Sequence, residues 1–192
     1  WNTFTNMPQS AFVVYDMDGN LKAMVGSTGI KATGDRSQLN RAVSQRSPGS
    51  SIKPLTAYAP AIENNLVTYS SIVSDTPFME NNPETGNPWP QNYDKKYHGD
   101  MNLYYALQWS YNTIPVKLID QLGVENSYNF ATQKVGLNLD ESDKNYAPLA
   151  TGSLTNGITI NELTNAYQIF GNGGIYNSSI CYTSVTDAAG RV

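Results

Sequence analysis

The stretch Arg46-Ser47-Pro48-Gly49-Ser50-Ser51-Ile52-Lys53-Pro54-Leu55 decides how this chain is understood, because it combines the start of a helix with two residues suited to joint chemistry. Over positions 51–63 apolar residues recur at three- and four-residue steps, which predicts an amphipathic helix. Pro54 falls in its first turn, where a missing N–H costs little. Ser50 and Lys53 are three residues apart and therefore share one helix face.

This placement suits a nucleophile and its base. The partial positive charge at a helix N-terminus favours an alkoxide forming on Ser50. Lys53 can serve as the base if burial or neighbouring dipoles draw its pKa well below about 10.4. The motif alone is not specific, because 17 Ser and 8 Lys in 192 residues predict about 0.7 matches by chance. An ordinary capped helix is therefore the alternative interpretation.

A second polar motif, Ser110-Tyr111-Asn112, lies between two segments with helical spacing, 101–109 and 113–122. A turn at this point can present a hydroxyl for proton relay and a carboxamide for a peptide-like substrate. The same tripeptide recurs at 127–129, where a solvated helix face explains it better. We therefore take Ser110 and Asn112 as candidate site residues.

The two ends of the chain predict β-structure. Apolar runs at 11–15 and 21–25 flank Asp18-Gly19, which is typical of a β-hairpin. Residues 182–186 alternate like a strand, and 187–190 read as a turn. We expect a severed hairpin here, because an unpaired edge is rarely tolerated in a complete domain.

Between these ends, two further features stand out. A loop with four prolines spans about 74–100, and so long a loop is often functional. Thr159 and Glu162 form a capping box at the start of a predicted helix, which ends before the glycines of 171–174.

The composition excludes several classes of protein. Twelve Lys+Arg against 16 Asp+Glu give a net charge of −4, which argues against nucleic acid and anionic membranes as partners. A single cysteine, Cys181, excludes an intrachain disulfide and a multi-cysteine metal site, and His98 is the only imidazole. No apolar run approaches the roughly 18 residues of a membrane span. We expect neither a metal nor a cofactor.

In order and spacing, the chain resembles the transpeptidase domain of class A (bifunctional) penicillin-binding proteins. The signature of penicillin-binding proteins joins Ser-x-x-Lys to Ser-Asp-Asn and Lys-Thr-Gly. The resemblance covers nearly all of the chain. It is carried by the hairpin at 14–26, Arg46–Leu55, Pro90-Gln91-Asn92-Tyr93-Asp94 through Gly99, Ala106–Thr113, and the helix and turn within 152–174.

The resemblance implies a role for each candidate residue. Ser50 would be the acyl-accepting nucleophile, with its own N–H as half of the oxyanion hole, and Lys53 its general base. Ser110 would pass a proton to the leaving amine, and Asn112 would hold the peptide side of the substrate. The implied substrate is the D-Ala-D-Ala end of a peptidoglycan stem peptide, and β-lactam antibiotics would acylate the same serine. No metal or cofactor is implied.

The resemblance also implies an α+β, penicillin-binding/serine β-lactamase-like fold, incomplete at its C-terminal strands. Residues 1–192 would be a partial transpeptidase domain, with an opening hairpin and connection in 1–45, a helical subdomain in 46–175 and a severed hairpin in 176–192. Lys-Thr-Gly does not occur in the chain. We therefore expect a polypeptide that is catalytically incomplete without the rest of its own domain.

The parent protein would be membrane-anchored, act on the extracytoplasmic face of a bacterial membrane, and serve cell-wall synthesis, cell shape and antibiotic resistance. The alternatives are a serine D,D-carboxypeptidase or β-lactamase, and a β-lactam-sensing module that acylates without turnover. A Ser-His-Asp triad through His98 is disfavoured, because Lys53 already shares the helix face of Ser50.

Overall fold

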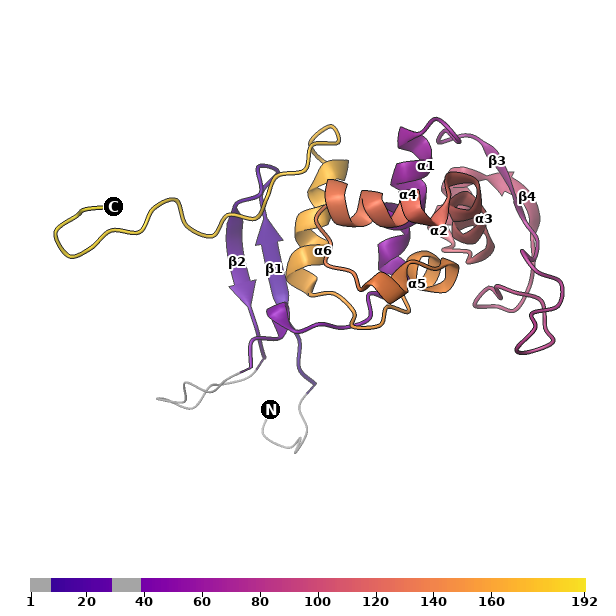
Figure 1. Cartoon of the computed structure of the whole chain (residues 1–192), viewed down its shortest axis with the longest axis horizontal. Helices are drawn as coiled ribbons and strands as arrows, with labels where there is room; N and C mark the ends of the chain where they lie inside the picture. The colour runs from indigo at the N-terminus through magenta and orange to yellow at the C-terminus, as the bar shows by residue number, and fades with distance from the viewer. Residues whose placement is uncertain (1–7, 29–38) are drawn as a thin grey trace. The chain divides into compact units, whose positions relative to one another are not determined.

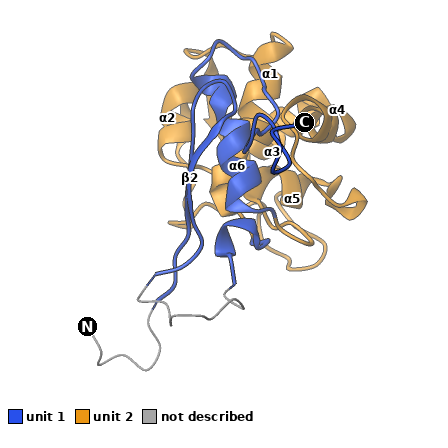
Figure 2. Ribbon diagram, turned by 90° about the vertical axis from the view of Figure 1, so that its left-hand side faces the viewer, with its two compact units in different colours: residues 1–46, 158–192 blue, residues 47–157 orange. Residues whose placement is uncertain are grey.

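The computed structural model describes residues 8–28 and 39–192 of the chain (Figure 1). They fall into two compact units, one made of residues 1–46 and 158–192 and the other of residues 47–157 (Figure 2). The second boundary differs from the one predicted at 175/176. The helix that follows Thr159 packs against the hairpin of the first unit, and sequence periodicity does not reveal such a partner.

The first unit opens with the predicted hairpin. Strands β1 (Phe12–Tyr15) and β2 (Leu21–Val25) pair antiparallel, with Phe12 opposite Val25. Gly19 has a φ of +82°, a left-handed conformation that glycine adopts without a steric penalty. The hairpin prediction is confirmed.

Helix α6 (Ile160–Ala166) begins at the predicted capping box and continues as the 3₁₀ segment η6 (Tyr167–Phe170). The Thr159 hydroxyl accepts from the Glu162 N–H at 3.0 Å, and the Glu162 carboxylate accepts from the Thr159 N–H at 2.8 Å. The helix lies alongside β1 (Figure 1).

The C-terminal segment differs from its prediction. Residues 182–186 form no strand in the described chain, although the turn at 187–190 is present, closed by the Asp187 N–H donating to the Arg191 carbonyl at 2.9 Å. Only Ile180 pairs, in an isolated bridge with Asn20. Alternating residues favour a strand, but a strand forms only where a partner edge is available.

The second unit begins with the helical run that carries Ser50 and Lys53. It comprises the 3₁₀ turn η2 (Gly49–Ile52), the π segment η3 (Pro54–Tyr58) and α1 (Ala59–Glu63). Ile52 and Leu55 are fully buried, as the helical spacing requires. The prediction of a helix over 51–63 is confirmed, with a tighter first turn and a wider second one.

A two-stranded sheet corrects the sequence interpretation of the Pro-rich region. Strands β3 (Ile72–Asp75) and β4 (Gly99–Asn102) pair antiparallel across the ends of the long loop, with Asp75 opposite Gly99. Helical spacing had predicted a helix from 101, but α2 (Leu103–Gln108) begins only after β4. Pairing with β3 outweighs local helix preference at 101–102.

Helix α3 (Thr113–Leu122) has the predicted bounds and is buried along most of its length. Helices α4 (Val124–Asn129) and α5 (Tyr146–Thr151) pack against it, and the π segment η4 (Phe130–Lys134) packs against η3 and α4. The 3₁₀ turn η5 (Glu141–Asp143) precedes α5. Within α4, Ser127 is fully buried and donates to the Thr56 carbonyl at 2.6 Å. The expectation that 127–129 forms a solvated face was therefore wrong for Ser127.

Candidate active site

The amine of Lys53 is the centre of a cluster that contains three of the four predicted site residues. The side chain is fully buried. Its Nζ donates to the Asn112 Oδ1 at 2.6 Å, the Ser110 carbonyl at 2.7 Å, the Ser110 Oγ at 3.2 Å and the Tyr111 carbonyl at 3.3 Å. Within residues 8–28 and 39–192, no carboxylate lies within ion-pair distance of this amine. Neutral oxygens alone stabilise it.

Burial changes the ionisation of Lys53. Loss of hydration disfavours the ammonium and lowers the pKa of Lys53 to about 8. At neutral pH roughly a tenth of the amines are then uncharged, against fewer than one in a thousand for an ordinary lysine. For Lys53 to act as a base, its pKa must lie well below the ordinary value, and the burial of its amine produces such a pKa.

Ser50 lies in η2, one turn before Lys53, and is exposed. The Lys53 N–H donates to the Ser50 carbonyl, which fixes the two residues on one turn. The Ser50 hydroxyl makes no hydrogen bond within the described chain, whereas the neighbouring Ser51 hydroxyl donates to the Pro48 carbonyl at 2.7 Å. The structure thus places Ser50 near the cluster without a direct bond to the Lys53 amine, and leaves its hydroxyl open to a ligand.

Ser110 adopts an unusual backbone conformation. Its φ is +56°, in the left-handed region that residues other than glycine rarely enter. This conformation turns the Ser110 carbonyl and hydroxyl toward the same amine. Such strain persists only where the surrounding structure fixes the backbone, and it often marks a functional site.

The side-chain amide of Asn112 has a defined orientation. Its Nδ2 donates to the Gln91 carbonyl at 2.8 Å, so Oδ1 must face the Lys53 amine. Its backbone N–H donates to the Asn92 Oδ1 at 2.8 Å. Gln91 and Asn92 were not among the predicted site residues. Their sequence signal was the Pro90–Asp94 segment of the family resemblance.

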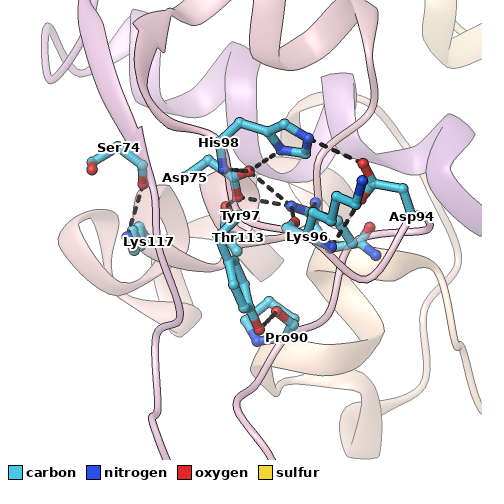
Figure 3. A network of polar contacts seen from close by, with 11 residues as sticks. Ser74, Asp75, Pro90, Asp94, Lys96, Tyr97, His98, Thr113 and Lys117 are labelled. Carbon is cyan, nitrogen blue, oxygen red and sulfur yellow. Dashed lines mark hydrogen bonds and ion pairs between the residues drawn. The ribbon is translucent and has the colours of Figure 1, made fainter.

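His98 does not belong to a serine triad. Its Nδ1 lies 2.8 Å from the Asp75 carboxylate and its Nε2 lies 3.0 Å from that of Asp94 (Figure 3). Its ring stacks on that of Tyr111. No contact with Ser50 is present in the described chain. The groups of His, Cys, Asp and Glu in these residues form no cluster suited to a metal ion.

Close packing of two glycines supports the turn before Ser50. Gly152 has a φ of +76°, and a Cβ at this position would collide with the Gly49 carbonyl oxygen. We expect Gly152→Ala to lower the free energy of unfolding by about 2–4 kcal/mol, because backbone strain and steric overlap add. Gly86→Ala is the matched control, since Gly86 also has a positive φ of +67° but a Cβ there would meet no atom beyond its chain neighbours within 4 Å. Thermal denaturation of both variants measures the difference, and equal losses would contradict the packing role.

Comparison with known families shows the group to which the chain belongs. The model of the family described as "Penicillin binding protein transpeptidase domain" matches residues 10–189. The chain belongs to this family. The mixture of helices and small sheets corresponds to part of the penicillin-binding protein fold, which confirms the predicted fold class.

Individual relatives point to the same group. Penicillin-binding protein 1A of Clostridium acetobutylicum is 38% identical over 192 residues, covering 96% of this chain and 24% of the relative. The protein of the same name from Aquifex aeolicus is 38% identical over 191 residues, covering 95% of this chain and 25% of the relative. The chain therefore spans about a quarter of the length of these relatives.

Solved structures share the fold. Penicillin-binding protein 1A from Haemophilus influenzae aligns with a TM-score of 0.75 and 29% identity, over 95% of this chain and 26% of that one. PonA1 from Mycobacterium tuberculosis, solved in complex with penicillin V, aligns with a TM-score of 0.74 and 21% identity, over 95% of this chain and 49% of that one. In the described part of the chain, no helix is both long enough and apolar enough to cross a membrane.

Proposed function

We propose that this chain is the part of a peptidoglycan D,D-transpeptidase that supplies the nucleophile, its base and the second motif. The observation that carries the proposal is the buried Lys53 amine, held by Ser110 and Asn112 one turn from the exposed Ser50. A lysine of lowered pKa beside a serine at a helix start is an arrangement suited to acyl transfer.

The proposed reaction, which the family resemblance implies, gives each of these residues a step. The Ser50 hydroxyl oxygen forms a bond to the carbonyl carbon of the penultimate D-alanine, and its proton passes to the Lys53 Nζ. The C–N bond to the terminal D-alanine then breaks, and the leaving amine receives a proton through Ser110. An acceptor amine attacks the resulting ester, its proton returns to Ser50, and the new amide is released.

Asn112 is assigned to hold the substrate's peptide group, and the Ser50 N–H to stabilise half of the oxyanion. We further propose that residues 1–192 are a partial domain that requires a Lys-Thr-Gly strand from the rest of its protein. The whole protein would act in cell-wall synthesis on the extracytoplasmic face of the membrane and would bind β-lactams.

The proposal is tested with the full-length protein that contains this chain. We expect it to release D-alanine from an acyl-D-Ala-D-Ala peptide and to transfer the acyl group to an added amine. Release without transfer would identify a carboxypeptidase, and rapid hydrolysis of penicillin a β-lactamase. Slow, stable acylation by penicillin without any peptide turnover would indicate a sensor. Absence of both acylation and turnover would overturn the assignment.

The isolated 192-residue chain is expected to react with fluorescent penicillin at least about a hundredfold more slowly than the full-length protein. The loss of even one oxyanion donor costs on the order of 10²–10³ in rate. Gel fluorescence over a time course gives both rates. Efficient labelling of Ser50 in the isolated chain would contradict the proposed incompleteness.

A further inference from the structure

Asp75, at the end of β3, is a buried carboxylate that is linked to the second motif through hydrogen bonds. It is fully buried. Burial by itself would raise its pKa, but hydrogen bonds from Thr113, Asn92 and His98 hold the pKa of Asp75 below its usual range. A buried charge of this kind is retained only where several donors satisfy it.

Each donor to Asp75 connects it to a different residue of the turn at 110–113. The Thr113 hydroxyl donates to Asp75 directly at 2.5 Å (Figure 3). The Asn92 Nδ2 donates to both carboxylate oxygens at 2.9 and 2.8 Å, which directs the Asn92 Oδ1 to the backbone N–H of Asn112. The Asp75 carboxylate is thus linked to Thr113 and Asn112, and a third link reaches Tyr111.

The link to Tyr111 runs through His98. The His98 N–H donates to Asp75 at 2.9 Å, and its ring stacks on Tyr111 with centroids 4.5 Å apart. Two further charged groups border the cluster. Asp94 contacts the far side of the imidazole, and Lys117 donates to the Ser74 carbonyl at 2.8 Å and the Thr76 hydroxyl at 2.6 Å.

The turn needs such support because it is strained and because its polar groups converge. Ser110 has a positive φ, and oxygens of Ser110, Tyr111 and Asn112 all point at the Lys53 amine. A flexible lysine side chain cannot by itself hold three backbone positions. Asp75 supplies the further support, because its donors reach Thr113 directly and Asn112 and Tyr111 through Asn92 and His98.

We propose that Asp75 is a positioning residue for acylation, which fixes the 110–113 turn through Thr113, Asn92 and His98 so that its oxygens stay on the Lys53 amine. Asp75 touches neither Ser50 nor Lys53 and acts only through the turn. The inference rests on the proposed function, since it assigns Asp75 to the same acyl transfer.

The test is Asp75→Asn in the full-length protein. The substitution keeps the shape but places an NH₂ group where donors converge, so the turn loses its anchor. We expect the second-order rate of acylation by fluorescent penicillin to fall at least about tenfold. We also expect the midpoint of its pH dependence to fall by about one pH unit, because the ammonium loses charge-assisted hydrogen bonds.

Asp143→Asn is the matched control. Asp143 is also a buried carboxylate of the same unit, and it accepts from the Thr155 N–H at 2.7 Å, the Thr155 hydroxyl at 2.8 Å and the Asp140 N–H at 3.2 Å. It has no bond to the 110–113 turn. We expect this variant to lose thermal stability but to keep the acylation rate and the pH midpoint of the wild type.

A second pair of variants covers the case in which Asp75→Asn does not fold. Thr113→Val removes only the hydroxyl donor to Asp75, and Thr113→Ser restores it. We expect about a threefold slower acylation and a lower pH midpoint for Thr113→Val, with recovery in Thr113→Ser.

The outcomes separate the two proposals. If Asp75→Asn folds and keeps the wild-type midpoint of the pH dependence of acylation, the positioning role is overturned while the proposed function stands. The same conclusion holds if Thr113→Val keeps that midpoint, or if either variant changes only as Asp143→Asn does. If the wild-type protein is neither acylated by penicillin nor active on the acyl-D-Ala-D-Ala peptide, the proposed function fails and the positioning role fails with it.

Discussion

Replacement of Ser50 by alanine is expected to abolish covalent labelling by penicillin in the full-length protein while leaving its thermal stability unchanged. The hydroxyl is exposed and makes no hydrogen bond within the described chain, so its removal leaves no buried group unpaired. The acyl-enzyme, in contrast, cannot form without it. Intact-mass spectrometry after incubation with penicillin measures the adduct.

Ser51→Ala provides the control for this variant. Ser51 is the next residue on the same turn, and its hydroxyl donates to the Pro48 carbonyl at 2.7 Å. We expect this variant to be labelled at the wild-type rate with a loss of stability of about 1 kcal/mol, the usual cost of one hydrogen bond. A penicillin adduct on Ser50→Ala, or its loss in Ser51→Ala alone, would place the nucleophile elsewhere.

Substitution of Lys53 by methionine is expected to slow acylation by about 10³-fold, within the range that general-base catalysis contributes. Methionine retains most of the buried aliphatic volume and removes the amine. Lys144→Met is the control, because Lys144 is a surface lysine paired with Glu125 and Glu141. Stopped-flow or gel-based acylation rates compare the variants. A Lys53→Met protein that retained more than a tenth of the wild-type rate would exclude Lys53 as the base.

The role of Lys53 as the base also predicts the direction in which the acylation rate changes with pH. Only the uncharged amine accepts a proton, so wild-type acylation should rise about tenfold per pH unit up to about pH 8 and then level off. Lys53→Met should lack this dependence. Because the pKa falls from its unfolded value of 10.5 to about 8 on folding, wild-type stability should also rise relative to Lys53→Met between these two pH values. An acylation rate of the wild-type protein that stayed constant from pH 6 to 9 would contradict the lowered pKa of Lys53, on which both expectations rest.

Local patterns predicted the elements that depend on local chemistry. The hairpin around Asp18-Gly19, the helix over 113–122 and the capping box at Thr159 were confirmed because turn residues, periodicity and capping act within a few residues. The spacing of Ser50 and Lys53 likewise follows from one helical turn. Periodicity also placed Ser110 and Asn112 correctly between two helices.

Features that depend on distant partners could not be predicted. Asp75 gains its importance from donors 17 to 38 residues away, Asn92, His98 and Thr113, and nothing in its immediate sequence shows them. Strand β4 owes its form to pairing with β3, and α6 belongs with the hairpin through packing. The burial of Ser127 could not be predicted, because it depends on the hydrogen bond of its hydroxyl to the carbonyl of the distant Thr56. Tertiary contacts decided each of these.

Because no carboxylate pairs with Lys53 in the described chain, binding of a substrate and attack on it are favoured by opposite charge states of the Lys53 amine. Near neutral pH most molecules carry a positive charge at this amine, which attracts an anionic substrate, and capture of the anion in turn makes the proton harder to remove. Acidic conditions therefore favour docking and alkaline conditions favour attack. For an anionic substrate, the pH midpoint of acylation should therefore be higher at saturating concentration, which reports the complex, than at low concentration, which reports the free protein, and a neutral analogue should show no such difference.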